Sequence, residues 1–508
     1  MPNDIAGLNR KDIFFVIIGF TLTLAFHLLR LNYWTPLPDE INYALSAKYL
    51  VANRTLIGND IMFFPPLFVY TAALLQKAGV ELLLSVRMIS AIAGAILPVA
   101  FYFAMRADYR PKTAFIATGI LLSLFSFHSY SRLGQVEILM LMFIALSICG
   151  ILYKKPFWAG IFLGLGLWTK ETTLGALLSF FIFYLLQPTG SRKSLILLLG
   201  GAIPPVLLLL LLGALTGQNL LFEILASRGY DINMLKLSPF ANFISLAINL
   251  GYNLLPRLFY QWEFVTFAVL GPIATLFLLF LTLRGGIKKR PFTMLITCYL
   301  LVHLPFFFFF SRKFDYYLLP PALMIILGGS CELFEEKGYS RRLHIFGKAL
   351  LSALAIFNIY TDTFLYFDRG THQSFEIAVK NLPLGTSVAT SHPTLIEYLS
   401  NRFTKNLKII PIFQPGGYHL DLNVMRESTI TTVIVKKYYF DRLRKTYPME
   451  WDSILSIFAI KEEIVDRIWS VWLTTQKPAT FRSKLLKNLT HLLRPIGVIV
   501  LRRHFLNL

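Results

Sequence analysis

Two adjacent carboxylates follow the first long apolar segment of the chain, and their position suits proton transfer. They lie in the sequence Pro38-Asp39-Glu40-Ile41-Asn42-Tyr43. A carboxylate can act as a general base toward an acceptor hydroxyl or amine. A solvated surface loop would carry the same residues, so the pair alone does not establish a site.

Charged residues also occupy the other short connections that charge patterning, described below, places on the outer side. They are Arg132 and Glu137, Lys170 and Glu171, and Arg312, Lys313 and Asp315. Lysine and arginine can bind a phosphate and stabilise the charge on a departing phosphate. Ionisable groups at the ends of membrane spans are costly unless paired or hydrated, so we predict that these residues share a cavity open to the outside. Because nucleotide sugars are absent there, an activated phosphate would be attached to a lipid, but the residues do not identify the transferred group.

The composition is that of an integral membrane protein. Of 508 residues, 55% are apolar, 45 are Phe and only 15% are charged, more apolar surface than a soluble domain of this length can bury. The net charge of +21 is scattered between apolar runs, which favours basic cytoplasmic loops over nucleic-acid binding. Cys149, Cys298 and Cys331 lie far apart and form no disulfide framework or metal-ligand pair.

About 20 apolar residues cross the hydrocarbon core of a bilayer, and fewer suffice for a short helix. The sequence predicts about eleven transmembrane helices, at Ile13–Leu31, Met88–Met105, Thr113–Phe127, Ile138–Tyr153, Phe157–Trp168, Thr172–Leu186, Leu195–Leu215, Phe264–Leu283, Phe292–Phe310, Tyr316–Leu333 and Ile345–Tyr366. The first lacks a small-residue cleavage site and is interpreted as a retained span.

Loop charge gives the predicted orientation. With the N-terminus inside, the cytoplasmic loops are the basic ones, including Arg106/Arg110/Lys112 and Arg284/Lys288/Lys289/Arg290. Two further apolar stretches would invert these loops if they crossed the membrane. We therefore predict that Phe63–Ala78 lies at the outer surface and that Phe240–Leu255 does not span. Residues 1–366 then form the transmembrane domain, and the rest lies outside.

The chain beyond 366 predicts a small extracytoplasmic α/β domain over 367–480. Short β-rich runs at Ser387–Thr390, Leu407–Phe413 and Thr431–Lys437 alternate with helical patterns such as Thr394–Ser400. Residues 481–508 predict a basic amphipathic helix on a membrane surface, since leucines recur at helical spacing among lysines and arginines. A helix packed on the soluble domain is the alternative.

These features resemble the GT-C glycosyltransferase superfamily, close to the protein O-mannosyltransferase and aminoarabinose transferase branch (glycosyltransferase family 39-like). The resemblance covers roughly the first 330 residues. It rests on the order and spacing of Asp39-Glu40-Ile41-Asn42-Tyr43, Phe64-Pro65-Pro66-Leu67, Arg87, Ser131-Arg132 with Glu137, Gly164-Leu165-Gly166-Leu167-Trp168-Thr169-Lys170, and Ser311-Arg312-Lys313 with Tyr316-Tyr317-Leu318-Leu319-Pro320.

The resemblance implies a membrane glycosyltransferase that moves a sugar from a polyprenyl-phosphate donor to a lipid, glycan or protein acceptor by an inverting single displacement. It implies that Asp39 is the catalytic base and that Glu40 orders the first loop. Lys170, Arg312 and Lys313 match positions near the lipid phosphate, whereas Arg87 and Arg132 would bind phosphate or brace the first loop. Supporting positions are Glu137, Tyr43 and Tyr316. No metal or other cofactor is indicated.

The sequence departs from the family's pattern at two positions, and two other functions are alternatives. The family commonly has His or another polar residue at Phe64, and Asp at Glu137. A lipid-linked glycan ligase or polymerase is the nearer alternative, and a transporter or flippase the further one, because paired repeats and mid-membrane charges are not visible. Gly160, Gly164 and Gly166 are interpreted as a helix-packing pattern, and His27, His128 and His303 lack metal-ligand spacing.

Overall fold

The chain forms two compact units, one of residues 1–31 and 43–366 and one of residues 32–42 and 367–508. The computed structural model describes residues 10–32, 36–53, 66–187, 191–215, 271–309, 315–335, 340–362, 373–390, 393–411, 432–436, 458–465 and 497–503, with a few helical residues between 246 and 254. Each unit is considered by itself.

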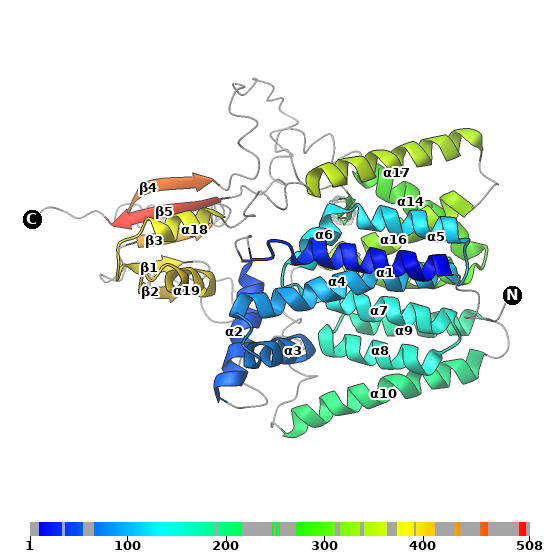
Figure 1. Ribbon diagram of the computed structural model, residues 1–508, viewed down its shortest axis with the longest axis horizontal. Coiled ribbons are helices and arrows are strands. Elements are labelled where there is room, and N and C mark those ends of the chain that lie inside the picture. The colour runs from blue at the N-terminus through cyan, green and yellow to red at the C-terminus, as the bar shows by residue number, and fades with distance from the viewer. Residues whose placement is uncertain are drawn as a thin grey trace, which may run out of the picture. The chain divides into compact units, whose positions relative to one another are not determined.

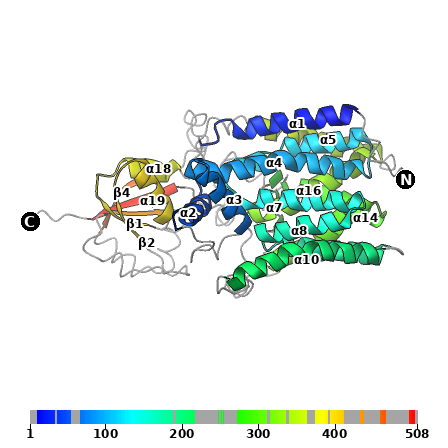
Figure 2. The ribbon, with the colours of Figure 1, turned by 60° about the horizontal axis from the view of Figure 1, so that its bottom comes forward.

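The first unit is helical, and its long helices run side by side (Figures 1 and 2). They are α1 (Arg10–Leu28), α2 (Pro38–Asn53), α3 (Pro66–Lys77), α4 (Leu82–Arg106), α5 (Pro111–Leu122), α6 (Phe125–Arg132), α7 (Val136–Leu152), α8 (Pro156–Thr169), α9 (Thr173–Leu186), α10 (Ser191–Leu215), α14 (Gly271–Ile287), α15 (Pro291–Phe309), α16 (Asp315–Glu335) and α17 (Arg341–Asp362). Proline opens several of them, where its missing N–H costs no helical hydrogen bond.

Each of the eleven predicted segments overlaps at least one of these helices. By length and apolar composition, five of the described helices can cross a membrane, or six if the bent pair α5–α6 is one crossing; five further apolar helices are shorter. The number of crossings therefore stays a prediction. Helix α3, within the stretch predicted to lie at the outer surface, has 12 residues and extends about 18 Å, and its place at that surface stays a prediction.

The core of this unit lies between α4, α7 and α16. Buried positions make up 89% of the apolar window of α16 and 67% of that of α4, but 22% of those of α10 and α17. The outward faces of α10 and α17 carry exposed side chains such as Leu207, Leu211 and Ile356. Hydrocarbon is the solvent that such faces require.

The predicted close packing of glycines is confirmed between α8 and α10. A Cβ on Gly160 would overlap the carbonyl oxygen of Leu198, and one on Gly201 would overlap that of Phe157. A Cβ on Gly164 would lie 2.8 Å from the ring of Pro205. Small residues let two membrane helices approach closely.

The helix predicted over Thr113–Phe127 is instead broken. Helices α5 and α6 meet at a 62° bend. The backbone N–H of Phe125 donates to Asn358 Oδ1 of α17 at 2.9 Å, and Ser126 Oγ donates to the carbonyl of Asn253 at 2.7 Å. Partners from distant parts of the chain therefore satisfy polar groups at the break.

The second unit contains a five-stranded mixed sheet in the order β2-β1-β3-β5-β4. Its elements are α18 (Gln373–Lys380), β1 (Ser387–Thr390), α19 (Pro393–Arg402), β2 (Lys408–Pro411), β3 (Thr432–Lys436), β4 (Phe458–Val465) and β5 (Gly497–Arg503). Strand β1 is parallel to β2 and β3, pairing Ala389 with Ile410 and Val433, and β5 is antiparallel to β3 and β4.

The end of the chain requires a correction. Residues 497–503 form β5 between β3 and β4, so this part of the predicted 481–508 tail belongs to the sheet. The run Gly-Val-Ile-Val-Leu is rich in β-branched residues, which favour strands. The amphipathic helix expected over 485–496 lies outside the described residues, as does most of Phe240–Leu255.

Candidate active site

The backbone that leaves α1 is bound by two buried arginines, and we call its residues Leu29–Leu31 the exit turn. Arg132 donates to the carbonyls of Leu29 and Arg30 at 2.8 and 3.2 Å, and Arg87 donates to the carbonyl of Leu31 at 2.8 Å. Carbonyls at a helix C-terminus lack helical partners and carry partial negative charge, which a guanidinium complements. These contacts support the bracing role for Arg87 and Arg132.

Arg30 itself has the left-handed backbone conformation, with φ 53°. A residue with a Cβ adopts it at a cost of about 1–2 kcal/mol, so it persists where surrounding contacts require it. The hydrogen bonds to the exit turn provide such contacts. The chain therefore leaves α1 in a defined direction.

Asp39 and Glu40 lie in the first turn of α2. The first turn of a helix presents free N–H groups and favours negative charge. Glu40 is completely buried, whereas Asp39 is half-buried. Of the two, Asp39 is thus the carboxylate that can meet an acceptor. Residues 32–42, which include both, group with residues 367–508 in the second unit.

Glu137 and Lys170 form a buried ion pair in the first unit. Glu137 stands in the first turn of α7, Lys170 caps the C-terminus of α8, and their side chains are 2% and 6% exposed. Lys170 Nζ donates to Glu137 Oε1, and its backbone N–H donates to the carbonyl of Gly166 at 2.8 Å. Lys170 thus joins the end of α8 to the start of α7 through its side chain.

This pair and the exit turn lie at one end of the first unit, which we call the exit end. Arg132 ends α6, and Glu137 follows five residues later at the start of α7. Ser90 Oγ of α4 donates to the carbonyl of Gln135 in this short link at 3.0 Å. Since α8 packs against α7 and ends at Lys170, the structure brings together Arg87, Arg132, Glu137 and Lys170 at the exit end.

Of four other predicted residues, only Tyr43 has a described side chain. The ring of Tyr43 packs edge-on against Phe68, with centroids 5.3 Å apart, and thereby links α2 to α3. Arg312 and Lys313 lie outside the described residues, as does the side chain of Tyr316. Within the part of the chain that the structure describes, no three His, Cys, Asp or Glu side chains are placed to hold a metal ion.

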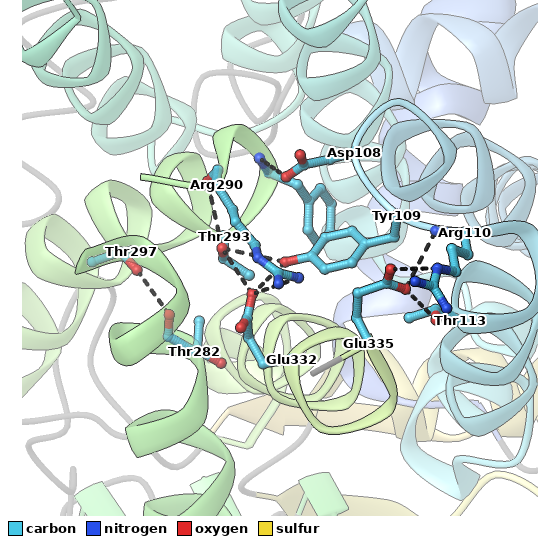
Figure 3. A network of polar contacts seen from close by, with 11 residues as sticks. Asp108, Tyr109, Arg110, Thr113, Thr282, Arg290, Thr293, Thr297, Glu332 and Glu335 are labelled. Atoms are coloured by element: carbon cyan, nitrogen blue, oxygen red, sulfur yellow. Dashed lines mark hydrogen bonds and ion pairs between the residues drawn. The ribbon is translucent and has the colours of Figure 1, made fainter. Parts of the chain in front are cut away.

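Sequence reasoning missed a polar network at the opposite end of α4, which we call the Glu332 end (Figure 3). Tyr109 Oη donates to Glu332 Oε1 at 2.5 Å, and Arg290 lies 3.8 Å from the same oxygen. Burial raises the pKa of the Tyr109 hydroxyl, and the neighbouring Glu332 carboxylate adds to this effect, so the hydroxyl keeps its proton and donates.

Two further ion pairs lie among the same helix ends. Arg106 of α4 pairs with Asp12 of α1 at 3.5 Å, and Arg110 pairs with Glu335 of α16 at 3.1 Å. The start of α1 and the end of α4 therefore share one end of the unit, while the exit turn and Arg87 share the other. The only signal for this network in the sequence was the presence of acidic residues in predominantly basic loops.

Comparisons with known proteins agree with this architecture. Residues 64–212 match the sequence family described as dolichyl-phosphate-mannose-protein mannosyltransferase. No curated protein matches the chain in direct sequence comparison. Fifteen solved chains match it in structure.

Two solved structures illustrate the likeness. ArnT from Cupriavidus metallidurans in the apo state is 11% identical with a TM-score of 0.52, and the match covers 96% of this chain and 97% of ArnT. The oligosaccharyltransferase of Archaeoglobus fulgidus in the apo form is 13% identical with a TM-score of 0.53, covering 85% of this chain and 71% of that enzyme. The resemblance to GT-C membrane glycosyltransferases is thus confirmed, and the chain has their fold.

Proposed function

We propose that this protein is a membrane glycosyltransferase that transfers a sugar from a polyprenyl-phosphate donor to an acceptor on the outer face of the membrane. The observation that carries the proposal is that Arg87, Arg132 and the buried Glu137–Lys170 pair lie together at the exit end, where they contact the backbone that follows α1. A structure of ArnT from Cupriavidus metallidurans bound to undecaprenyl phosphate, 10% identical with a TM-score of 0.50, supports the donor class.

The proposed reaction is one displacement at the anomeric carbon. An acceptor hydroxyl or amine attacks this carbon, Asp39 takes the acceptor's proton, and the bond from the anomeric carbon to the phosphate oxygen breaks. Its electron pair leaves with the lipid phosphate, whose charge Lys170 stabilises together with Arg312 and Lys313. The sugar is inverted, because the acceptor enters on the face opposite the phosphate.

Each residue at the exit end then has a separate task. Glu137 holds Lys170 at the end of α8, while Arg87 and Arg132 fix the backbone from which the Asp39 connection departs. Glu40 orders the start of α2 from its buried position. The exit end faces outward in this proposal, which places residues 367–508 outside, next to an acceptor arriving from water.

A transferase of the ArnT type is favoured over one of the oligosaccharyltransferase type. The match spans 97% of ArnT but 71% of the oligosaccharyltransferase, so the chain corresponds to the whole of the former only. A lipid-linked glycan ligase remains the second candidate, supported by the shared fold.

The test uses the purified full chain in lipid nanodiscs with a panel of undecaprenyl-phosphate pentoses and hexoses. Release of undecaprenyl phosphate is measured for the wild type, Lys170→Gln and the exposed-lysine control Lys77→Gln. We expect release from at least one donor, lost in Lys170→Gln and kept in Lys77→Gln. Absence of release from every donor in the presence of mixed envelope lipids and glycans as acceptors would contradict the proposal.

A further inference from the structure

Two buried histidines near the exit turn form a hydrogen-bonded pair between α1 and α6. His27 Nε2 lies 3.0 Å from His128 Nδ1, and the two side chains belong to residues that are 0% and 6% exposed. His128 Nε2 lies 2.6 Å from the carbonyl oxygen of Leu122, the last residue of α5. His27 Nδ1 lies 3.4 Å from the carbonyl oxygen of Ala91 in α4.

The distances assign the protons of a neutral pair. A carbonyl only accepts, so the short contact to Leu122 requires a proton on His128 Nε2, and the Nδ1 of a neutral His128 is then an acceptor. His27 must donate to it from Nε2. The remaining contact, to Ala91, is the longest of the three and receives no proton. The neutral pair thus carries two ring N–H protons, one on each Nε2. A third proton, on His27 Nδ1, would make the pair positively charged among apolar helices and close to Arg132, which is costly.

Within the described residues, the pair and Arg132 are two hydrogen-bonded links between α6 and the end of α1. His128 and Arg132 are four residues apart and so lie on the same face of α6. His128 contacts His27, the penultimate residue of α1, and Arg132 contacts the exit turn two to three residues later. Both links therefore fix the same short piece of backbone.

Gly94 of α4 leaves room for the side chains that make these links. A Cβ on Gly94 would lie 2.6 Å from Ser131 Cβ and 3.1 Å from His27 Cε1. The histidine pair also joins the two sides of the α5–α6 bend, because His128 belongs to α6 and its acceptor Leu122 ends α5. The bend, α1 and α4 are thus tied together through one imidazole pair.

We propose that His27 and His128 are positioning residues for the proposed transfer, on which this inference rests. They set the orientation of α6, so that Arg132 fixes the exit turn, from which the chain continues to Asp39. Neither histidine touches the reacting atoms. Their loss should therefore lower the turnover of bound substrate and leave the affinity for the lipid phosphate unchanged.

The experiment compares four variants with the wild type in nanodiscs. His27→Phe removes the donor, His27→Gln keeps an N–H near the Nε2 position, and His27→Phe/His128→Phe removes the pair. His344→Phe, on α17 near the Glu332 end, is the matched control. Undecaprenyl phosphate release gives kcat and KM with the active donor, and undecaprenyl phosphate itself is the probe for binding.

We expect His27→Phe to lower kcat about 10- to 100-fold, the cost of a small misplacement of a catalytic group, with less than about a twofold change in binding. His27→Gln should recover most of the loss. The double variant should be no slower than His27→Phe, because both remove one interaction.

The outcomes separate the two hypotheses. A wild type that releases no lipid phosphate from any donor overturns the proposed function and this inference together. An active wild type whose His27→Phe variant keeps normal kcat overturns the inference alone. A lower unfolding temperature with unchanged kcat, or a His27→Gln variant as slow as His27→Phe, also rejects positioning through this hydrogen bond.

Discussion

The buried Glu137–Lys170 pair gives a quantitative prediction about stability. With side chains 2% and 6% exposed, neither charge can turn to bulk water when its partner is removed. Breaking a buried pair from one side costs about 3–5 kcal/mol, whereas replacing both partners by apolar residues is often neutral. We therefore expect Glu137→Leu and Lys170→Met each to lose about 3 kcal/mol or more of unfolding free energy, and the double variant to lose much less.

The assay is unfolding of the purified protein by SDS in mixed micelles, for the wild type, both single variants and the double variant. Arg110→Met is the control, because the Arg110 side chain in its pair with Glu335 is 70% exposed and such pairs contribute less than about 1 kcal/mol. Additive losses in the double variant would refute the reasoning, since they would mean that the two charges do not stabilise each other. The double variant should also lose affinity for undecaprenyl phosphate; normal affinity would refute the phosphate role of Lys170.

Two further predictions concern other parts of the first unit. Gly160→Ala should destabilise the protein by about 1–3 kcal/mol, because the new Cβ meets the backbone of α10. Gly200→Ala is the control and should leave stability unchanged, because the space around Gly200 is open. Equal unfolding temperatures for the two variants would contradict this packing. Burial raises the pKa of Asp108 above its usual value of 3.8, so its contribution is greatest below pH 3.8 and is lost as pH rises through the raised pKa. Asp108→Asn should therefore gain stability relative to the wild type as pH rises from 4 to 7, and thermal unfolding that shows no such trend would exclude this effect.

The sequence did not indicate that Asp39 and Glu40, expected in an outer loop, begin helix α2. Apolar runs and loop charge were sufficient to predict the apolar helical segments, because a membrane helix must satisfy its own backbone and display apolar side chains along its length. They did not predict the bend between α5 and α6. There the polar groups of Phe125 and Ser126 bond to Asn358 and Asn253, more than a hundred residues away. No local pattern contains that information.

Part of the candidate site could also be predicted, because charged residues at the ends of apolar segments are visible in the sequence. The pairing of Glu137 with Lys170 follows from charges at adjacent span ends, and it was foreseen as a shared location. The targets of Arg87 and Arg132 are backbone carbonyls, which every residue carries, so the sequence left phosphate binding and bracing as alternatives. The histidine pair joins residues 101 positions apart and leaves no spacing signal.

The strand β5 shows a different limit. Leucines at helical spacing over 485–496 favoured an amphipathic helix, and residues 497–503 were assigned to the same basic tail, 481–508. The β-branched residues of 497–503 instead pair with β3 and β4, matching Ile434 with Val500 and Ile464 with Val498. Strand pairing is decided by cross-strand contacts that the sequence of one strand does not contain.

The measurement that tests the central claim most directly compares Asp39→Asn with Glu40→Gln during sugar transfer in lipid nanodiscs. With the active undecaprenyl-phosphate donor, the initial rate is measured and the anomeric configuration of the product is determined by NMR. Loss of a general base lowers the rate about 10²–10⁴-fold, so Asp39→Asn should fall by this factor with little change in donor binding, and the wild-type product should be inverted. A near-normal rate in Asp39→Asn, or a product that retains the donor's configuration, would contradict the mechanism.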